Sequence, residues 1–375
     1  MIRSEPAPVD ADLRVGQNTT KPKCLSVDEV IDLLFECTRL RSLRLVGSRG
    51  DVCAVLDMLR GPTSVHSLTL SLWERGPPVL LPEELFGGQA PIRRIHFTAN
   101  RCIVAPPWLL RGVTHFTSGE QIPLLDLLDA LRQMSALTHF TLQHCRAHWE
   151  EADAPLDPPI QMPCLTNLIV HADSPRFFAM LNRRLALPLK SKRQLVLHAL
   201  AISGWDRWAR WFAFLLPNIK AANGLQHVYL TGGAKEGTFR AWTGDAATAY
   251  EDAEFCFEIY WYGSPTLTDS HFMNVTSPIL LLDGLCDLLG ATKHGRRLIL
   301  EGDLARSELP ASWWWKLLEK LPAVEVLEIH PNVGKALHSA WNGGDAPVVL
   351  PALRRVQFRQ NEAAASVAPV QPARE

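Results

Sequence analysis

The residues best suited to chemistry in this sequence are polar side chains that recur singly, at intervals of about 20–30 residues. Arg94, His115, His139 and Asn167 form such a series. Two imidazoles held side by side can ligate a metal ion, or they can make the binding of a partner depend on pH. A metal site needs further Cys, His or carboxylate ligands, and the series contains none. We therefore expect these residues to contact a binding partner and to hold no metal.

The members of the series lie in a shared local sequence pattern, which would put each of them at the same position of a repeated strand. In residues 136–145, ALTHFTLQHC, apolar side chains stand at Leu137, Phe140 and Leu142, and Cys145 follows three positions later. This is the leucine-rich-repeat frame LxxLxLxxN/C, in which a short strand is followed by a small polar residue. The pattern predicts a strand whose apolar residues face a core.

Versions of this frame recur along nearly the whole chain, with the spacing that is typical of leucine-rich repeats, about 20–29 residues. We call the middle apolar residue of each frame its anchor. About twelve frames are found. Their anchors are Leu43, Leu68, Ile95, Phe116, Phe140, Leu168, Leu195, Val228, Phe257, Leu298, Leu327 and Val356.

The segments between the frames have the apolar periodicity of helices. Examples are residues 50–61, 122–134, 205–219, 279–290 and 333–343, and residues 26–38 begin with a capping box, Ser26 and Glu29. Alternating strands and helices predict an α/β fold, a right-handed leucine-rich-repeat solenoid. It has a curved parallel sheet, helices on its outer face and degenerate repeats.

The same pattern predicts the domain organisation. We expect a flexible N-terminal tail over residues 1–24, one solenoid over residues 25–361 and a flexible C-terminal tail over residues 362–375. Residues 232–252 interrupt the rhythm, so we predict an irregular insert there.

The positions between the apolar residues of each frame should point to the open face of the sheet, where solenoids bind their partners. In the later frames these positions include Gln226, His227, Glu325, Glu328 and Arg355. A solvated polar face is the alternative for any single residue. The residues that we predict to bind a protein are Arg44, Arg94, His96, His115, Thr117, His139, Thr141, Asn167 and Tyr229.

Composition limits the classes of partner. The 375 residues carry a net charge of −1, so no bulk positive charge would collect nucleic acid or an anionic membrane surface. No apolar run approaches the roughly 20 residues that span a bilayer, and the first residues lack the apolar core of a secretion signal. The eight cysteines form no CxxC pair and fall mostly in apolar patterns, which indicates reduced thiols. We expect an intracellular monomer, in the cytoplasm or the nucleus.

Three segments carry a resemblance to a known family. They are residues 3–15 (RSEPAPVDADLRV), residues 80–97 (LLPEELFGGQAPIRRIHF) and the closing pair, residues 321–329 (LPAVEVLEI) and 349–358 (VLPALRRVQF). The arrangement resembles the repeat half of fungal F-box proteins, particularly the basidiomycete sets, over roughly residues 3–360. In that family an F-box docks on the adaptor of a cullin-type ubiquitin ligase, and the repeats hold the substrate.

This sequence departs from the family in lacking a recognisable F-box. Residues 1–25 are too short and too polar for its three helices, and residues 81–86 (LPEELF) only superficially match its opening. Gly87 and Gly88 should end a helix there, before the strand that begins by Ile92. We therefore expect a ligase adaptor to be a partner only if an F-box lies upstream.

The resemblance implies non-enzymatic protein recognition, as the substrate-binding part of an F-box-type ubiquitin ligase receptor. The alternative is a stand-alone leucine-rich-repeat scaffold, or a truncated paralogue, with no ligase role. No GxSxG, HExxH or paired Cys–His motif occurs, so we predict no catalytic residue and no cofactor.

Overall fold

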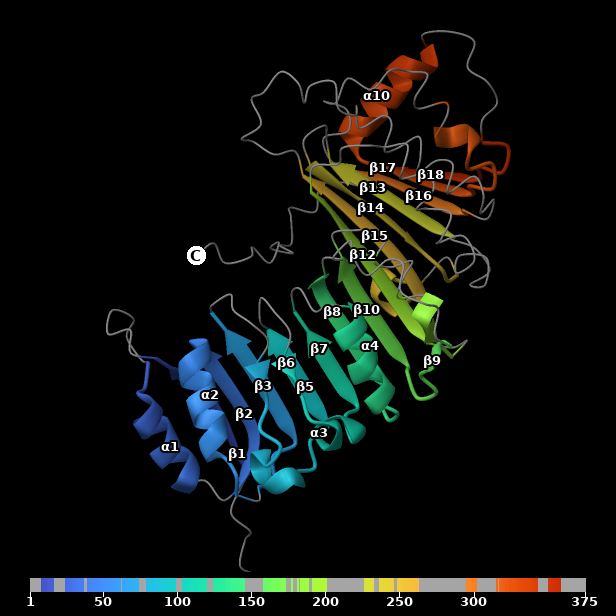
Figure 1. Ribbon diagram of the computed structural model, residues 1–375. Coiled ribbons are helices and arrows are strands. Elements are labelled where there is room, and N and C mark those ends of the chain that lie inside the picture. The colour runs from blue at the N-terminus through green and yellow to red at the C-terminus, as the bar shows by residue number, and fades with distance from the viewer. Residues whose placement is uncertain are drawn as a thin grey trace, which may run out of the picture. The chain divides into compact units, whose positions relative to one another are not determined.

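A computed structural model divides the chain into two compact units, residues 1–198 and 199–375, each with its own set of strands (Figure 1). The residues that the structure describes are 8–16, 24–36, 39–61, 63–73, 79–98, 103–119, 124–145, 158–172, 177, 181, 183–188, 191–200, 226–232, 236–245, 248–262, 295–301, 315, 317–342 and 350–358.

The described part of the first unit is built on parallel strands in the order β1-β2-β3-β5-β7-β8-β10-β12 (Figure 1). Parallel strands need a connection that returns the chain to the same end of the sheet, which the intervening helices and loops provide. The bounds are β1 (Val9–Val15), β2 (Leu40–Gly47), β3 (Ser67–Leu72), β5 (Arg94–Thr98), β7 (His115–Ser118), β8 (His139–Cys145), β10 (Asn167–Ala172) and β12 (Lys192–Leu200).

The predicted anchors of the first unit form one continuous row in the core. From Leu43 in β2 to Leu168 in β10, each anchor is the register partner of the next. All six are at most 4% exposed, and the rings of Phe116 and Phe140 stack with centroids 5.9 Å apart. Burying a large apolar side chain contributes roughly 1.5–3 kcal/mol. The row therefore fixes the register of six consecutive strands.

In β12 the predicted anchor, Leu195, lies two residues away from the position that pairs with the anchor of β10. Leu168 pairs with Arg193, and Leu195 pairs with Val170. The shift preserves the side of the strand, because side chains alternate with a period of two, and Leu195 is still buried. Arg193 takes the anchor position, where its guanidinium donates to the carbonyl of Pro188 and to the hydroxyl of Ser191.

Three helices lie where the sequence predicts them: α1 (Val27–Glu36), α2 (Arg49–Met58) and α4 (Leu124–Gln133). The short helix α3 (Pro107–Arg111) was not predicted. All four lie on one side of the sheet (Figure 1). The predicted capping box of α1 is present. The Glu29 amide donates to Ser26 Oγ (3.2 Å), and the Ser26 amide donates to the Glu29 carboxylate (2.8 Å).

The prediction of a flexible tail over residues 1–24 is wrong for residues 9–15, which form β1. This strand pairs in parallel with β2, so it adds a strand before the first predicted frame. The segment VDADLRV alternates apolar and polar residues, the pattern of a half-buried strand. The C-terminal tail predicted over residues 362–375 lies outside the described residues.

The described strands of the second unit follow the order β15-β14-β13-β16-β17-β18 (Figure 1). The pairs β13–β14 and β14–β15 are antiparallel, whereas β13, β16, β17 and β18 are parallel. The bounds are β13 (His227–Gly232), β14 (Glu236–Trp242), β15 (Phe255–Tyr262), β16 (Arg297–Glu301), β17 (Val326–Ile329) and β18 (Arg355–Phe358); helix α10 spans Pro331–Asn342.

The predicted insert over residues 232–252 is wrong where β14 forms, and the sheet is mostly parallel instead of wholly parallel. In β14, Phe239 is buried between the polar residues Thr238 and Arg240, and Ala241 is buried between Arg240 and Trp242. Ala241 joins the row of anchors, because Val228 and Phe257 are both its register partners. The hairpin moves β15 away from β16, so the strand order departs from the chain order.

The segment that resembled the start of an F-box contains no α-helix. A 3-10 turn, η1 (Leu85–Gly88), ends it, and Phe86 and Gly87 have the positive φ angles of 53° and 71°. Leu85 and Phe86 are fully buried. The glycine pair therefore ends the segment as predicted, and β5 begins at Arg94.

Two-residue parallel pairs complete the described structure of the first unit. They join β4 (Val79–Leu80) with β6 (Ile103–Val104), and β9 (Ile160–Gln161) with β11 (Leu185–Ala186). Among the described residues, no helix has both the length and the apolar character needed to cross a bilayer. The helices predicted over residues 205–219 and 279–290 lie outside the described residues.

Candidate functional site

The structure brings the predicted polar series together on the first unit. His115 pairs with Arg94 on β5 and with His139 on β8, and His139 pairs with Asn167 on β10. We call Arg94, His115, His139 and Asn167 the histidine row. It lies on the side of the sheet opposite to the buried anchors, because its members alternate with them along each strand.

The two imidazoles of this row are stacked. Their centroids lie 4.2 Å apart, with only 6° between the ring planes. Parallel strands hold equivalent side chains about 4.8 Å apart, so the sheet itself imposes the contact. The side-chain oxygen Oδ1 of the adjoining Asn167 is buried and has no hydrogen-bond partner.

Threonine hydroxyls determine which ring nitrogen of His115 and of His139 carries the proton. Thr138 Oγ1 donates its one proton to the carbonyl of Thr114 (2.9 Å) and lies 2.9 Å from His139 Nδ1. Thr114 repeats the arrangement with the carbonyl of Arg93 (3.1 Å) and with His115 Nδ1 (3.0 Å). Because the hydroxyl proton is already used, Nδ1 must donate to Oγ1. The Nε2 lone pair of each neutral ring is then left for a partner.

The charge state of His115 follows from its surroundings. Burial lowers the pKa of His115, and the charges of His139 and Arg94 lower that pKa further. The ring is therefore neutral at pH 7, where Nε2 accepts hydrogen bonds. An anionic partner would oppose these effects and favour the protonated ring.

A second row runs beside the first, two residues along each strand. Arg44, Thr69, His96, Thr117 and Thr141 are successive register partners in β2, β3, β5, β7 and β8. The pKa of His96 is lowered by burial and by the charge of Arg44. The two rows together are called the polar face.

The polar face is positively charged. From β2 to β12 its register positions include Arg44, Arg94 and Lys192 and no carboxylate. The acidic positions Asp10 and Asp12 are confined to β1, where Asp12 pairs with Arg44 at 3.3 Å. Both side chains of that pair are more than half exposed, so solvent screens the pair.

Tyr229, the last predicted site residue, belongs to the second unit and has different surroundings. Its hydroxyl donates to Glu301 (2.9 Å), and the Arg240 guanidinium stands 5.6 Å from its ring centroid. The ring packs against a cluster formed by Trp242, Ala253, Cys256 and Ile299. Tyr229 is therefore partly buried against this cluster, and its hydroxyl is already bonded to Glu301.

This cluster shows that the second unit covers part of its sheet on the side opposite to the anchors. Residues 243–245 and 248–254 lie on this side of β14 and β15, and Trp242 Nε1 donates to the carbonyl of Thr248 (3.1 Å). Beneath them Glu258 is 3% exposed, pairs with Arg240 and accepts from the hydroxyl of Tyr250 (3.0 Å). Burial, followed by the Glu258 charge, raises the pKa of Tyr250.

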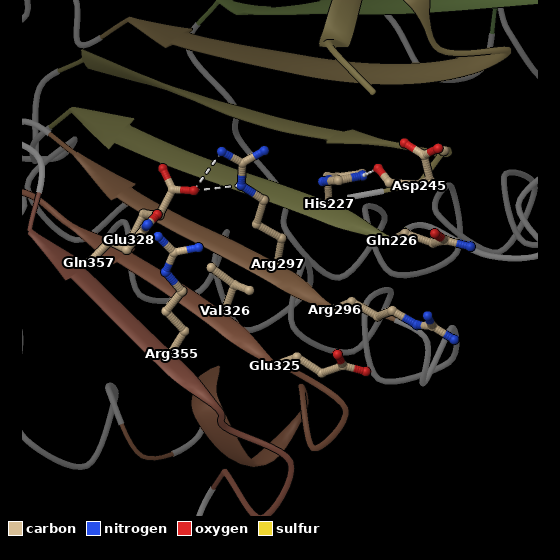
Figure 2. A pocket seen from close by; sticks show the side chains of 11 residues that line it. Gln226, His227, Asp245, Arg296, Arg297, Glu325, Val326, Glu328, Arg355 and Gln357 are labelled. Atoms are coloured by element: carbon tan, nitrogen blue, oxygen red, sulfur yellow. Dashed lines mark hydrogen bonds and ion pairs between the residues drawn. The ribbon is translucent and has the colours of Figure 1, made fainter. Parts of the chain in front are cut away.

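A cleft of about 530 Å³ lies beside this cover in the second unit (Figure 2). His227, Arg297, Val326 and Arg355 occupy one row of register positions across β13, β16, β17 and β18. Glu328 pairs with Arg297 through Nε (2.6 Å) and Nη2 (2.5 Å), and it is only 4% exposed.

His227 is the most buried polar group of the cleft, at 1% exposed. Its ring stacks on Trp242, with centroids 4.9 Å apart and 7° between the planes. Nε2 lies against the carbonyl of Asp245, which can only accept, so Nε2 carries the proton. Nδ1 is buried and has no hydrogen-bond partner.

The sequence identified several polar residues of the cleft, but it did not predict how His227 is buried. The frames place Gln226, His227, Glu325, Glu328 and Arg355 between apolar residues, and all five line the cleft. The register puts His227, Glu328 and Arg355 on one side of the sheet, as predicted. The burial of His227 depends on Trp242 and Asp245, which come from the hairpin that was predicted as an irregular insert. The alternation in EGTFRAW was the available signal for that hairpin.

Metal ligands do not gather in the described parts of either unit: no three His, Cys, Asp or Glu side chains there could share an ion. Comparison of the sequence with protein-family models and with curated proteins found no match.

The stacked pair makes a testable prediction about titration. Replacing His139 with Gln removes the neighbouring charge, so the pKa of His115 should rise toward its ordinary value of 6.5. Histidine-selective NMR titration would measure it, with His338→Gln on α10 as the control. An unchanged or lower pKa of His115 in the His139→Gln variant would contradict the stacked arrangement.

Proposed function

We propose that this protein is a non-enzymatic recognition protein whose polar face binds an acidic segment of a partner protein. The observation that carries the proposal is the histidine row, with stacked imidazoles and an adjoining amide oxygen that lacks a partner. The Asn167 oxygen needs a hydrogen-bond donor, which a backbone amide of a bound segment can supply. The imidazoles, once protonated, can donate from Nε2 to carboxylates of the same segment.

Charge complementarity selects the partner. The face holds Arg44, Arg94 and Lys192, and no Asp or Glu occupies its register positions from β2 to β12, so a segment rich in Asp or Glu would be attracted and a basic one repelled. Carboxylates near His115 would also raise its pKa. Binding should therefore take up protons and strengthen as the pH falls below about 7.

The architecture that we propose is a leucine-rich-repeat solenoid. Its support is the row of buried anchors, which recurs at the spacing of that repeat, and the parallel pairing of the strands that carry them. Solenoids of this kind bind partners on an open sheet face, as proposed here.

The resemblance to fungal F-box proteins suggests a biological role as the substrate-binding part of a ubiquitin ligase receptor, acting as an intracellular monomer. The alternative is a stand-alone repeat scaffold with no ligase role. Both use the same polar face, and they differ in whether a ligase adaptor is a second partner.

The recognition function can be tested by measuring the binding of peptides that differ in charge. Equal-length peptides rich in Glu, in Ser or in Lys would be titrated against the purified protein at pH 6 and pH 7.5. We expect only the Glu-rich peptide to bind, and more tightly at pH 6. Replacing Arg94, His115 and His139 together with Gln should weaken this binding at least about tenfold, or 1.4 kcal/mol.

A matched control carries the same three substitutions outside the polar face, at Arg111, His330 and His338. These residues lie on or beside α3 and α10. Equal binding by the polar-face variant and the control would contradict the proposal.

The ligase role has a separate test. If an F-box is encoded upstream, the full-length protein should co-precipitate the cullin adaptor, and deletion of the F-box should abolish this. Failure to recover the adaptor would favour the stand-alone scaffold and would leave the peptide result unaffected.

A further inference from the structure

The cleft of the second unit contains a buried group whose hydrogen-bonding capacity is unmet. His227 Nδ1 has no partner although the side chain is almost fully buried. An unsatisfied buried polar atom costs about 1–3 kcal/mol, and native structures rarely retain one without a reason. The ring cannot turn its other nitrogen to this position without losing the bond to the Asp245 carbonyl.

The position of Nδ1 indicates what could satisfy it. Figure 2 shows Nε2 directed at Asp245 and the opposite edge of the ring directed toward the side on which Arg297 stands. Arg297 is the register partner of His227. A ligand in the cleft could therefore contact Nδ1 and lie close to the guanidinium groups.

The charges that line the cleft favour an anion. Glu328 is neutralised by Arg297, and Glu325 has Arg354 at 3.9 Å. Among the described residues, Arg296 and Arg355 form no ion pair. Two cationic side chains are thus left at the cleft once its carboxylate–arginine pairs are formed.

The sheet leaves room for a ligand between the cationic side chains. Val326 occupies the register position between Arg297 and Arg355, so the strands of the two arginines are roughly 10 Å apart across a short apolar floor. A cleft volume of about 530 Å³ lies within the range of small-molecule sites, about 300–1,000 Å³.

We propose that this cleft binds a small molecule that carries an oxyanion, a carboxylate or a phosphate, between His227 and Arg355. The oxyanion accepts a hydrogen bond from a protonated His227 Nδ1 and pairs with the Arg355 guanidinium. This site is separate from the polar face of the first unit and does not rest on the function proposed for that face.

Binding at this site is coupled to protonation. Burial lowers the pKa of His227, and the Arg297 charge lowers it further. The carbonyls of Asp245 and Gly244 and the Asp245 carboxylate act in the opposite direction, and Trp242 covers one ring face without charge. An anion at Nδ1 raises this pKa, so its binding takes up a proton. Affinity should then increase up to tenfold per pH unit as the pH falls.

Inorganic phosphate and acetate are the probes for this proposal, titrated into the whole protein with histidine-selective NMR detection. We expect saturable binding that moves the His227 ring signals, with an affinity higher at pH 6 than at pH 7.5. The stronger of the two probes identifies the oxyanion as a phosphate or a carboxylate.

Arg355→Gln and Lys335→Gln form a matched pair of variants, because each removes one positive charge from an exposed side chain, Arg355 on β18 and Lys335 on α10. Arg355→Gln should weaken binding at least about fivefold, whereas Lys335→Gln, which lies outside the cleft lining, should stay within about twofold.

His227→Gln tests the buried group directly, and it should remove the pH dependence. If that variant does not fold, the comparison of Arg355→Gln with Lys335→Gln still tests the proposal. Failure of both probes to bind saturably, binding that leaves the His227 signals unperturbed, or equal effects of Arg355→Gln and Lys335→Gln would overturn the proposal.

Discussion

Register between parallel strands is the constraint on which this structure depends. Each anchor from Leu43 to Leu168 is buried against the next, and a slip of one residue would turn the whole apolar set of a strand away from the core. Because side chains alternate along a strand, burial of the anchors also determines which polar residues meet on the opposite side. The stacking of His115 on His139 thus follows from the stacking of Phe116 on Phe140.

The two units use this constraint differently. The first leaves its polar rows uncovered by the helices, which pack on the anchor side, and the rows carry positive charge without carboxylates between β2 and β12. In the second unit, residues 243–245 and 248–254 cover part of the corresponding side, which buries Glu258 and His227. The same strand pattern therefore supports an extended polar surface in one unit and a partly covered cleft in the other.

Much of the α/β framework could be predicted, because local alternation decides which residues are buried. The anchors, the α1 capping box and the neighbours of His115 were all predictable for that reason. The register of β12 could not be predicted, because the segment QLVL can be aligned with the repeat frame in two ways. Only the observed pairing with β10 distinguishes the two alignments. The hairpin of β13 and β14 was missed because EGTFRAW is short and charged, and the burial of His227 was missed with it.

Disulfide trapping between β7 and β8 tests the register most directly. In a cysteine-free background, cysteines at positions 115 and 139 would be compared with cysteines at positions 115 and 141. Register partners lie about 4.8 Å apart, within disulfide reach, whereas diagonal partners lie about 7–8 Å apart. The register predicts that the 115–139 pair crosslinks rapidly under mild oxidation and that the 115–141 pair crosslinks slowly. Faster crosslinking of the 115–141 pair would contradict the register and, with it, the arrangement of the polar face.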